Sequence, residues 1–540
     1  MSPAVSSLPR RRLSGGGGLG RATATVSALN LVSRLTGFAR VVAMSAALGA
    51  TPLGDAYQSA NLVSNILFEL LAGGLLASVL VPTFVELIDA DRRRDAARLA
   101  GILLGAALAA LGVVVAVAIA VAPWIMRFLT LGVDDGDVRT GQVELGTFLL
   151  WFFLPQVLLY AVGAVATALL HADRRFVAAA VAPVCNNLVV IAAMVTFAVM
   201  RDGDTSLPLA LGERLVLAAG ATGGVLAMSV VPLAAAWRGG LAVRPRWPRH
   251  EPRLRGLAGR GAWAAGHLGV NQIVAVATIV LANGVAGGVV AYQVALTFFL
   301  LPYALLANPL TTTLYPRLAG RAAAGDHDTF AADLAWGLRM VAFALVPAAV
   351  LLAALAAPLL DVVRLGALDD AGADLVAATV AGYALGLVGY GAFFLLTRAA
   401  YALDDVRSPT LVNASASAAG IVTMVVVASV ASGTGRLVAL GVIHAAIVSV
   451  GSVALLVLLR SQLRRTLAVG AALARDLGFA VLAGAATLGV VAALDPGSRA
   501  ASLAAVAVGG AVGVGVYLGG QILVRAPELT RRATPVGEGR

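Results

Sequence analysis

Long apolar segments recur along almost the whole chain, and this recurrence restricts its fold more than any other feature. A helix needs about 20 mostly apolar residues to cross the hydrocarbon core of a membrane. The mean hydropathy of +0.91 lies far above that of soluble proteins. The sequence therefore predicts an all-α integral membrane protein with 14 transmembrane helices. Their expected positions are 23–48, 56–88, 99–124, 146–170, 176–200, 214–236, 261–285, 288–315, 335–360, 376–400, 409–431, 436–459, 477–494 and 500–524.

The arginines indicate an orientation for these spans. All 39 basic residues are arginine, because the chain contains no lysine. If the first span enters from the cytoplasm, 29 of them fall in cytoplasmic tails and loops, seven fall outside, and Arg34, Arg40 and Arg339 lie within spans. Positively charged loops stay in the cytoplasm, so we expect a multi-pass protein of the cell (inner) membrane with both termini cytoplasmic. This distribution accounts for the net charge of +11, and nucleic acid is not an expected partner.

The spans divide into two sets of six, separated by a stretch that holds seven arginines. The tripeptide Ala-Tyr-Gln begins at Ala56 and again at Ala291, in the second span of each set, which suggests an internal repeat. Two spans follow the second set as an appended pair. The predicted units are a disordered cytoplasmic tail at 1–22, an N-terminal lobe at 23–237, a basic cytoplasmic linker at 238–260, a C-terminal lobe at 261–459, the appended helices at 460–524 and a cytoplasmic tail at 525–540.

Two arginines of the first span lie where a charge is costly. A charged side chain at the centre of a membrane helix costs about 2.5–3.5 kcal/mol, so such residues face a bundle interior or a water-filled cavity. On a helical projection Ser33 and Gly37 share the arc of Arg34 and Arg40, and Leu35 lies on the opposite side. We therefore expect these four residues to face a polar cavity.

The second span carries a polar stripe of its own. Four side chains at i, i+3, i+7 and i+11 share one helix face: Gln58, Asn61, Asn65 and Glu69. Counted back from the turn between the two spans, Glu69 lies as deep as Arg34, which predicts an ion pair between them. Arg40 then keeps a less neutralised charge, suited to an anionic group such as a phosphate. The alternative is that these polar groups only hold helices together.

Several spans contain proline within the apolar run, which is typical of the bending helices of transporters. These prolines are Pro155, Pro183, Pro232, Pro302, Pro309 and Pro347. The sequence has no nucleotide-binding motif and no metal-ligand spacing. We expect neither enzyme activity nor a cofactor, and transport driven by an ion gradient or the membrane potential. His267 and Asn271, one turn apart in the seventh span, are weaker candidates for the cavity.

Four motifs carry a resemblance to a known family: "SRLTGFAR" (33–40), "GDAYQSA" (54–60), "HADRRFVAAAVAPVCNNLVVI" (171–191) and "TRAAYALDDVRSPTLVN" (397–413). Through them the chain resembles the MurJ/MviN family of lipid II flippases, in the multidrug/oligosaccharidyl-lipid/polysaccharide exporter superfamily. The resemblance implies fourteen helices in two lobes plus two. It also implies that an undecaprenyl-pyrophosphate-linked cell-wall precursor moves from the inner to the outer leaflet by alternating access.

The resemblance also assigns roles to single positions. It matches Arg34, Arg40, Asp55 and Asn65 to the family's site and places the appended helices beside the lipid tail. The full set of candidate substrate-binding residues is thus Arg34, Arg40, Asn65, Glu69, Asp55, Ser33, Gly37 and Asn61. Further partners that we expect are membrane lipids, a coupling ion and cell-wall synthesis proteins.

The chain departs from the family where further charges are expected. Phe68 and Thr297 stand in place of arginines, and Gly73 stands in place of a glutamate. The resemblance then implies a weaker hold on a pyrophosphate, in a divergent flippase or in a relative that no longer transports. Two other functions stay open: a cation-coupled exporter of small molecules, which would not need the appended helices, and a scaffold for cell-wall synthesis, which would not need the arginines.

Overall fold

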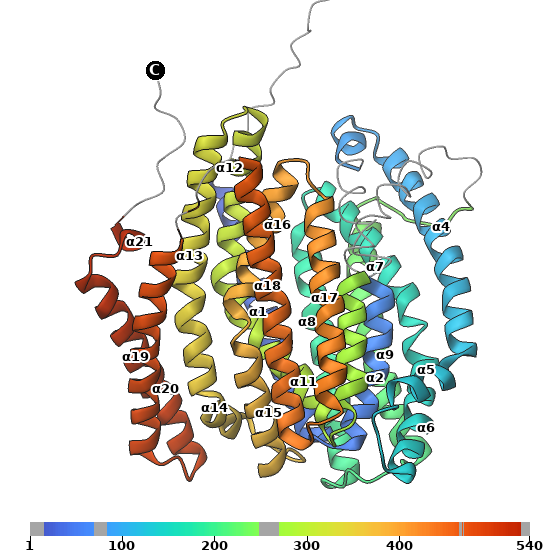
Figure 1. Ribbon diagram of the computed structural model, residues 1–540. Coiled ribbons are helices and arrows are strands. Elements are labelled where there is room, and N and C mark those ends of the chain that lie inside the picture. Colours follow the sequence, from blue (N-terminus) through green and yellow to red (C-terminus); the bar gives the residue numbers. More distant parts are fainter. Residues whose placement is uncertain (1–15, 70–83, 248–268, 464–466, 468, 531–540) are drawn as a thin grey trace, which may run out of the picture.

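The computed structural model describes residues 16–69, 84–247, 269–463, 467 and 469–530, and these residues form a bundle of long α-helices (Figure 1). The first group of helices consists of α1 (Gly16–Leu48), α2 (Pro52–Phe68), α4 (Arg93–Ala120), α5 (Ala122–Leu129), α6 (Gly136–Phe153), α7 (Gln156–Ala172), α8 (Phe176–Arg201) and α9 (Leu211–Arg238). Helix α1 begins several residues before the predicted span, and the rest of the predicted N-terminal tail, 1–15, lies outside the described residues.

The second group follows the basic linker, of which only the part up to residue 247 and no residue of 248–260 is described. It consists of the helix Gly269–Ala282, α11 (Gly288–Pro302), η2 (Tyr303–Ala307), α12 (Asn308–Ala323), α13 (His327–Ala354), α14 (Ala356–Val363), α15 (Asp370–Ala384), α16 (Leu387–Ala402), α17 (Arg407–Ala428) and α18 (Gly433–Leu463). The chain ends with α19 (Gly470–Leu494), α20 (Arg499–Leu523) and the short α21 (Pro527–Thr530).

The described helices match the predicted spans. Eleven are long and apolar enough to cross a membrane, and the bent pair α15–α16 makes a twelfth. The two remaining predicted spans, 56–88 and 261–285, run into residues that the structure does not describe, and α2 and the helix Gly269–Ala282 are their described parts. The predicted all-α membrane fold is therefore confirmed.

The prolines break fewer helices than the sequence suggests. Pro155 lies between α6 and α7, and Pro302 is followed by the π-helical turn η2. By contrast, Pro183, Pro232 and Pro347 lie inside α8, α9 and α13, which each run on as a single helix. A bend of 45° separates α15 from α16, and neither helix contains a proline. A proline ring removes one backbone hydrogen bond, and a long helix packed on its neighbours tolerates this loss.

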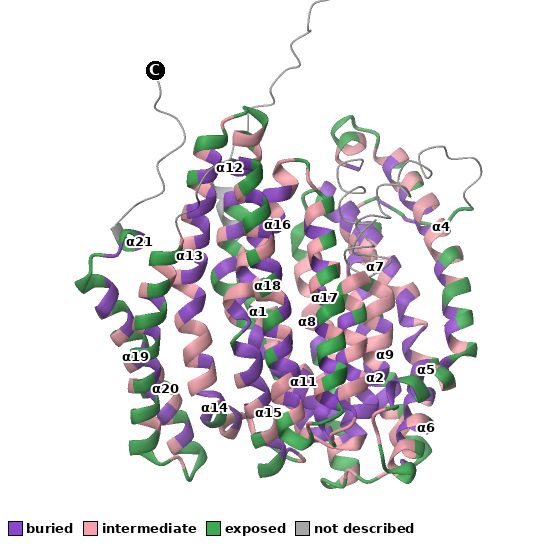
Figure 2. Cartoon of the chain, viewed as in Figure 1, coloured by how far each residue is buried: buried purple, intermediate pink, exposed green. Residues whose placement is uncertain are grey.

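The helices pack into two groups that meet through α1, α2 and α11. Within the first group, α8 packs on α1 and α9, and within the second group α18 packs on α15, α16 and α17. Buried residues gather where α2, α11 and α15 meet, whereas exposed residues run along α4, α19 and α20 (Figure 2). The packing fits two lobes, and the domain boundaries listed above stay a prediction.

The appended helices α19 and α20 pack on each other and on α13 and α14. Their contact is partly polar, because the Tyr517 hydroxyl donates a hydrogen bond to the Phe343 carbonyl oxygen at 2.9 Å. At one end the buried Asp476 accepts hydrogen bonds from Arg475 and Gln521, both at 2.8 Å. Apolar side chains such as Val481 and Leu482, 61% and 58% exposed, lie on the outer surface of the pair.

Candidate functional site

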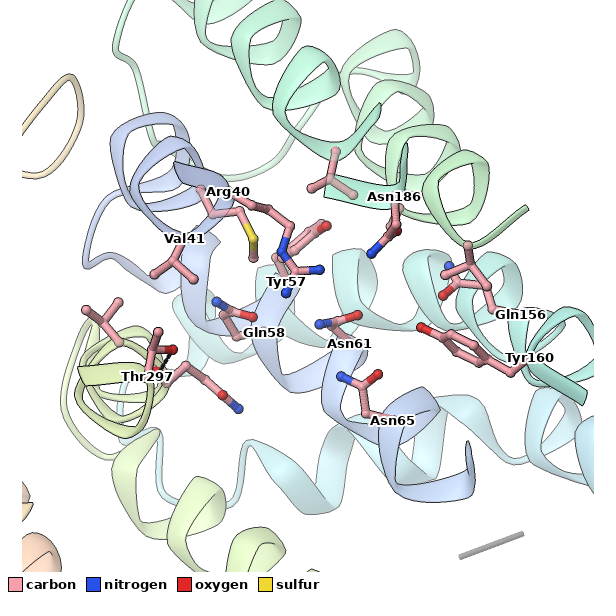
Figure 3. Close-up of a pocket in the computed structure, with 16 residues that line it drawn as sticks. Arg40, Val41, Tyr57, Gln58, Asn61, Asn65, Gln156, Tyr160, Asn186 and Thr297 are labelled. Carbon is pink, nitrogen blue, oxygen red and sulfur yellow. Dashed lines mark hydrogen bonds between the residues drawn. The ribbon is translucent and has the colours of Figure 1, made fainter. Parts of the chain in front are cut away.

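A polar cavity of about 180 Å³ lies between α1, α2, α7, α8, α9 and α11. Amide side chains from four of these helices line it, and Arg40 is the one charged side chain among the described residues of its wall. Figure 3 shows the guanidinium of Arg40 reaching into the space toward which the amides of Asn61 and Asn186 also point. The polar lining residues are Arg40, Tyr57, Gln58, Asn61, Asn65, Gln156, Tyr160, Asn186, Gln293 and Thr297.

Arg40 enters this cavity without an ion-pair or hydrogen-bond partner among the described residues. Its side chain is half-buried, its Nε atom is buried, and that atom has no hydrogen-bond partner in the described part of the chain. No described carboxylate forms an ion pair with it. A guanidinium whose Nε is buried without a partner is unfavourable by itself, so the site is suited to an anion that accepts two parallel hydrogen bonds.

A larger cavity, of about 680 Å³, adjoins the first. The two share Asn61, Asn65, Tyr160 and Gln293, so together they form one space between the two groups of helices. Most of the larger cavity's wall comes from the helix Gly269–Ala282, α16, α17 and α18. Glu69 is the one charged side chain on its described wall, and it accepts a hydrogen bond from Gln272.

The predicted stripe on α2 lines this space, since Gln58, Asn61 and Asn65 border the smaller cavity and Glu69 borders the larger one. That these residues contact a substrate stays a prediction. The repeated tripeptide Ala-Tyr-Gln supplies matching positions across the space, because Gln58 of α2 and Gln293 of α11 line the same cavity. Asn271, the weaker candidate, lines the larger cavity, and His267 lies outside the described residues.

Arg34 does not join this site. Its side chain is exposed, it borders neither cavity, and no ion pair links it to Glu69 in the described part of the chain. The predicted ion pair between Arg34 and Glu69 is therefore wrong. Arg34 and Arg40 are six residues apart, which separates them by about 120° around a helix axis, so only one of them can point at a given neighbour.

Ser33 and Gly37 pack against α8 and line neither of the two cavities. The amide nitrogen of Asn187 donates hydrogen bonds to the Ser33 carbonyl oxygen at 3.3 Å and to the Thr36 hydroxyl at 3.1 Å. A Cβ atom at Gly37 would lie 3.6 Å from the same nitrogen. For this part of α1 the alternative interpretation, polar groups that hold two helices together, describes the structure.

Replacing Asn187 with alanine should therefore lower stability and leave transport largely intact. The variant loses two hydrogen bonds between α1 and α8, and such bonds in membrane proteins contribute about 1 kcal/mol. The matched control is Asn186→Ala, because Asn186 lies next in sequence but lines the cavity. Thermal unfolding in detergent should shift downward for Asn187→Ala only. A larger shift for Asn186→Ala would contradict these roles.

Asp55 joins the two groups of helices and lines neither of the two cavities. It is fully buried, and its carboxylate accepts hydrogen bonds from the backbone N–H groups of Gly287, Val289 and Val290 at 2.7, 2.9 and 3.0 Å. These groups lie at the start of α11, in its N-cap residue Gly287 and its first turn, where free N–H groups and the positive dipole end suit a carboxylate. Its position fits a residue that holds the two groups of helices together better than the predicted contact with a substrate.

Three further bonds cross between the groups near Asp55. The Asn283 amide nitrogen donates to the Ser59 hydroxyl at 3.3 Å and to the Leu129 carbonyl at 2.9 Å. The Ala367 backbone N–H donates to the Ala46 carbonyl at 2.7 Å. All of these bonds lie at the end of the bundle where α5 and α14 lie, opposite the arginine-rich start of α4 (Figure 1).

The positions that depart from the family also border the cavities. The Phe68 ring packs on Tyr160 with 4.4 Å between ring centroids, and the Thr297 hydroxyl donates to the Gln293 carbonyl at 2.9 Å. Neither position places a charge in the cavity. Gly73 lies outside the described residues.

Several lining residues were not among the sequence candidates. Asn186, Thr397 and Asn413 occur within the quoted motifs but were not singled out. The available signal was a polar residue inside an apolar span, which by itself does not show the direction in which the side chain points.

Comparison with known proteins finds a matching family. A family model described as lipid II flippase MurJ matches residues 44–503. A probable lipid II flippase MurJ of Rhizobium tropici is 30% identical over 401 residues, which are 73% of each chain. The lipid II flippase MurJ of Burkholderia cenocepacia is 27% identical over 399 residues, 72% of this chain and 74% of that protein.

Solved structures share the fold. A structure of lipid II flippase MurJ in an inward closed conformation has a TM-score of 0.72 at 19% identity, covering 94% of this chain and 99% of that one. An inward-facing transporter of the multidrug MATE family has a TM-score of 0.64 at 11% identity, covering 82% and 98%. At these identities the likeness concerns the fold alone.

Proposed function

The chain belongs to the MurJ family of lipid II flippases, and from this membership we propose that it moves lipid II, or a close lipid-linked analogue, across the membrane by alternating access. One observation carries the proposal: an unpaired arginine, Arg40, projects among neutral amides into a space between two groups of helices. Such a site offers a bidentate cation to a pyrophosphate, and the described wall of the smaller cavity holds no acid to compete for it.

We further propose that both termini are cytoplasmic. In that orientation the bonds made by Asp55, Asn283 and Ala367 close the outer end of the space. Alternating access then requires these bonds to break, so that the two lobes part at the outer end. A coupling ion or the membrane potential supplies the driving force in this proposal.

The lipid tail needs a path outside the polar space. Helices α19 and α20 pack on α13 and α14 and expose a row of apolar side chains, among them Leu477, Val481 and Leu488. We propose that the tail lies along this pair while the polar headgroup crosses between the lobes. The pair then serves substrate binding as well as packing.

The direct test is rescue of cells depleted of their own lipid II flippase. Expression of this chain should restore growth and should restore exposure of the precursor at the outer leaflet, measured with an enzyme or probe that acts only outside the cell. Growth without precursor exposure would favour the scaffold alternative. If the chain inserts in the membrane but restores neither growth nor precursor exposure, the proposal is wrong.

A deletion of residues 470–530 separates the flippase from an exporter of soluble compounds. Because the tail path is lost, precursor exposure should fall to the level of depleted cells. The deletion must still reach the membrane, which membrane fractionation and gel filtration in detergent establish. Unimpaired precursor exposure by an inserted, monodisperse deletion variant would contradict the role given to α19 and α20.

A further inference from the structure

One wall of the larger cavity carries polar groups but no charge. We call its polar side chains the neutral wall: Asn271, Gln272, Tyr390, Thr397, Asn413 and Ser417, from the helix Gly269–Ala282, α16 and α17. The facing wall is built partly by α1 and α2 and holds Arg40 and Glu69. The two charges on the described walls therefore lie on the side of α1 and α2, where Glu69 meets Gln272 of the neutral wall, and the other side offers only uncharged donors and acceptors.

Two hydroxyls of the neutral wall are buried and unpaired. Thr397 and Ser417 are 7% and 3% exposed, and neither hydroxyl oxygen has a hydrogen-bond partner in the described chain. A helical threonine usually donates to the carbonyl four residues earlier, as Thr410 does to Val406 at 2.9 Å. Buried hydroxyls are rarely left without a partner, so these two are suited to bonds that a ligand supplies.

An amide pair extends this set. The Asn413 amide nitrogen donates to the Asn271 amide oxygen at 3.0 Å, which fixes the orientation of both side chains. The Asn271 amide nitrogen and the Asn413 amide oxygen then remain as one donor and one acceptor without a partner among the described residues. Paired donors and acceptors match the hydroxyl and acetamido groups of sugars, each of which donates and accepts.

Aromatic rings complete the wall. Tyr390 packs against Phe394 and Tyr303, with ring centroids 4.8 and 4.9 Å apart, and both Tyr390 and Phe394 border the cavity. Packing on this scale holds the rings rigid, so that they present apolar surface beside the amides and hydroxyls. Sugars combine apolar C–H faces with polar edges, and this wall offers both kinds of contact.

From these observations we infer that the neutral wall binds the sugars of the lipid-linked precursor, while Arg40 on the facing wall binds its pyrophosphate. The inference rests on the proposed function and deepens it, because it assigns an orientation to the headgroup. The anionic end lies toward α1 and α2, and the uncharged sugar end lies toward α16 and α17. A second anionic group on the ligand would find no cation among the described residues of the neutral wall.

The test compares three lipids: undecaprenyl pyrophosphate, the same lipid with its disaccharide, and lipid II, which adds the peptide. Binding to the full-length protein in nanodiscs should strengthen about 10-fold when the disaccharide is added, as several hydrogen bonds to uncharged groups would give. The double variant Thr397→Val, Ser417→Ala should lose most of this gain. Its affinity for undecaprenyl pyrophosphate should stay as it is in the unsubstituted protein.

Controls separate a binding role from a structural one. The double variant removes no hydrogen bond within the protein, so its melting temperature should be unchanged or higher. Ser415 is exposed, lies on α17 like Ser417, and does not line the cavity. The matched variant Ser415→Ala should therefore keep the full 10-fold gain in affinity from the disaccharide.

Three outcomes would overturn the inference. In the first, the gain in affinity from the disaccharide survives the double substitution. In the second, the double substitution lowers the affinity for all three lipids equally. In the third, the affinity rises only when the peptide is added. If the unsubstituted protein binds the first two lipids equally well, the inference fails alone. If it binds none of the three, the proposed function fails with it.

Discussion

Arg40→Ala is expected to lower precursor transport by about 100-fold or more. Bonds from a guanidinium to an ionised group contribute about 1.5–3 kcal/mol each, and a bidentate pair makes two of them. At 1.4 kcal/mol for each factor of ten, the loss of both bonds reaches about 100-fold in affinity for the pyrophosphate. The measurement is precursor exposure at the outer leaflet in cells that depend on this chain.

Two further variants show whether charge, geometry or both are needed. Arg34→Ala is the matched control, because Arg34 is exposed, borders neither cavity and lies on the same helix. It should reduce transport by less than about 3-fold, in line with the small effects of exposed charges. Arg40→Lys keeps the charge but loses the planar fork, and an intermediate loss is expected. Equal losses for Arg34→Ala and Arg40→Ala would contradict the assignment of the site to Arg40.

The membrane spans and the α2 stripe could be predicted from the sequence because both depend on local properties. Hydropathy over about 20 residues marks a span wherever it lies in the bundle. Gln58, Asn61, Asn65 and Glu69 lie on a single helix, whose regular geometry fixes their common face. Arg40 could be predicted because a charge without a partner inside a span must face the bundle interior or a water-filled cavity.

Relations between helices could not be predicted in the same way. The pairing of Arg34 with Glu69 used depth alone, whereas a contact also depends on how each helix is rotated and on which helix lies beside it. In the structure Glu69 meets Gln272, and the face of α1 that holds Ser33 meets α8. Apart from Asn271, a weaker candidate from the sequence, the residues of the neutral wall were not predicted, because they come from three separate helices and none of those helices carries a long polar stripe.

Asp55 illustrates a role that only the structure could give. The family motif pointed to Asp55 as a site residue, but nothing in the sequence relates it to the first turn of α11. A carboxylate near a short turn is usually interpreted as a cap of its own helix. Here it caps a helix of the other lobe, more than 230 residues away in the chain.

Asp55→Ala is therefore expected to shift the protein toward a state that is open at the outer end. The variant leaves three backbone N–H groups of α11 without their acceptor, and hydrogen bonds to a charged group contribute about 1.5–3 kcal/mol each. Water can replace these bonds only if the lobes part. The variant therefore lowers the stability of the closed state relative to the open state by several kcal/mol. A loss of about 3 kcal/mol changes the ratio of the two states by about 100-fold.

Labelling of a cysteine placed at Ser59 gives the readout, because Ser59 is buried beside the bonds that cross between the lobes. With Cys185 replaced, a membrane-impermeant reagent should label this site much faster in Asp55→Ala. Asp55→Asn keeps one oxygen as an acceptor, so its labelling rate should lie between that of Asp55→Ala and that of the protein with Asp55 unchanged. Ser64→Ala serves as the matched control, because its hydroxyl bonds to the Phe153 carbonyl within one lobe and does not cross between them. Unchanged labelling in Asp55→Ala would mean that apolar contacts alone hold the outer end closed, and Asp55 would then have no part in the transition between states.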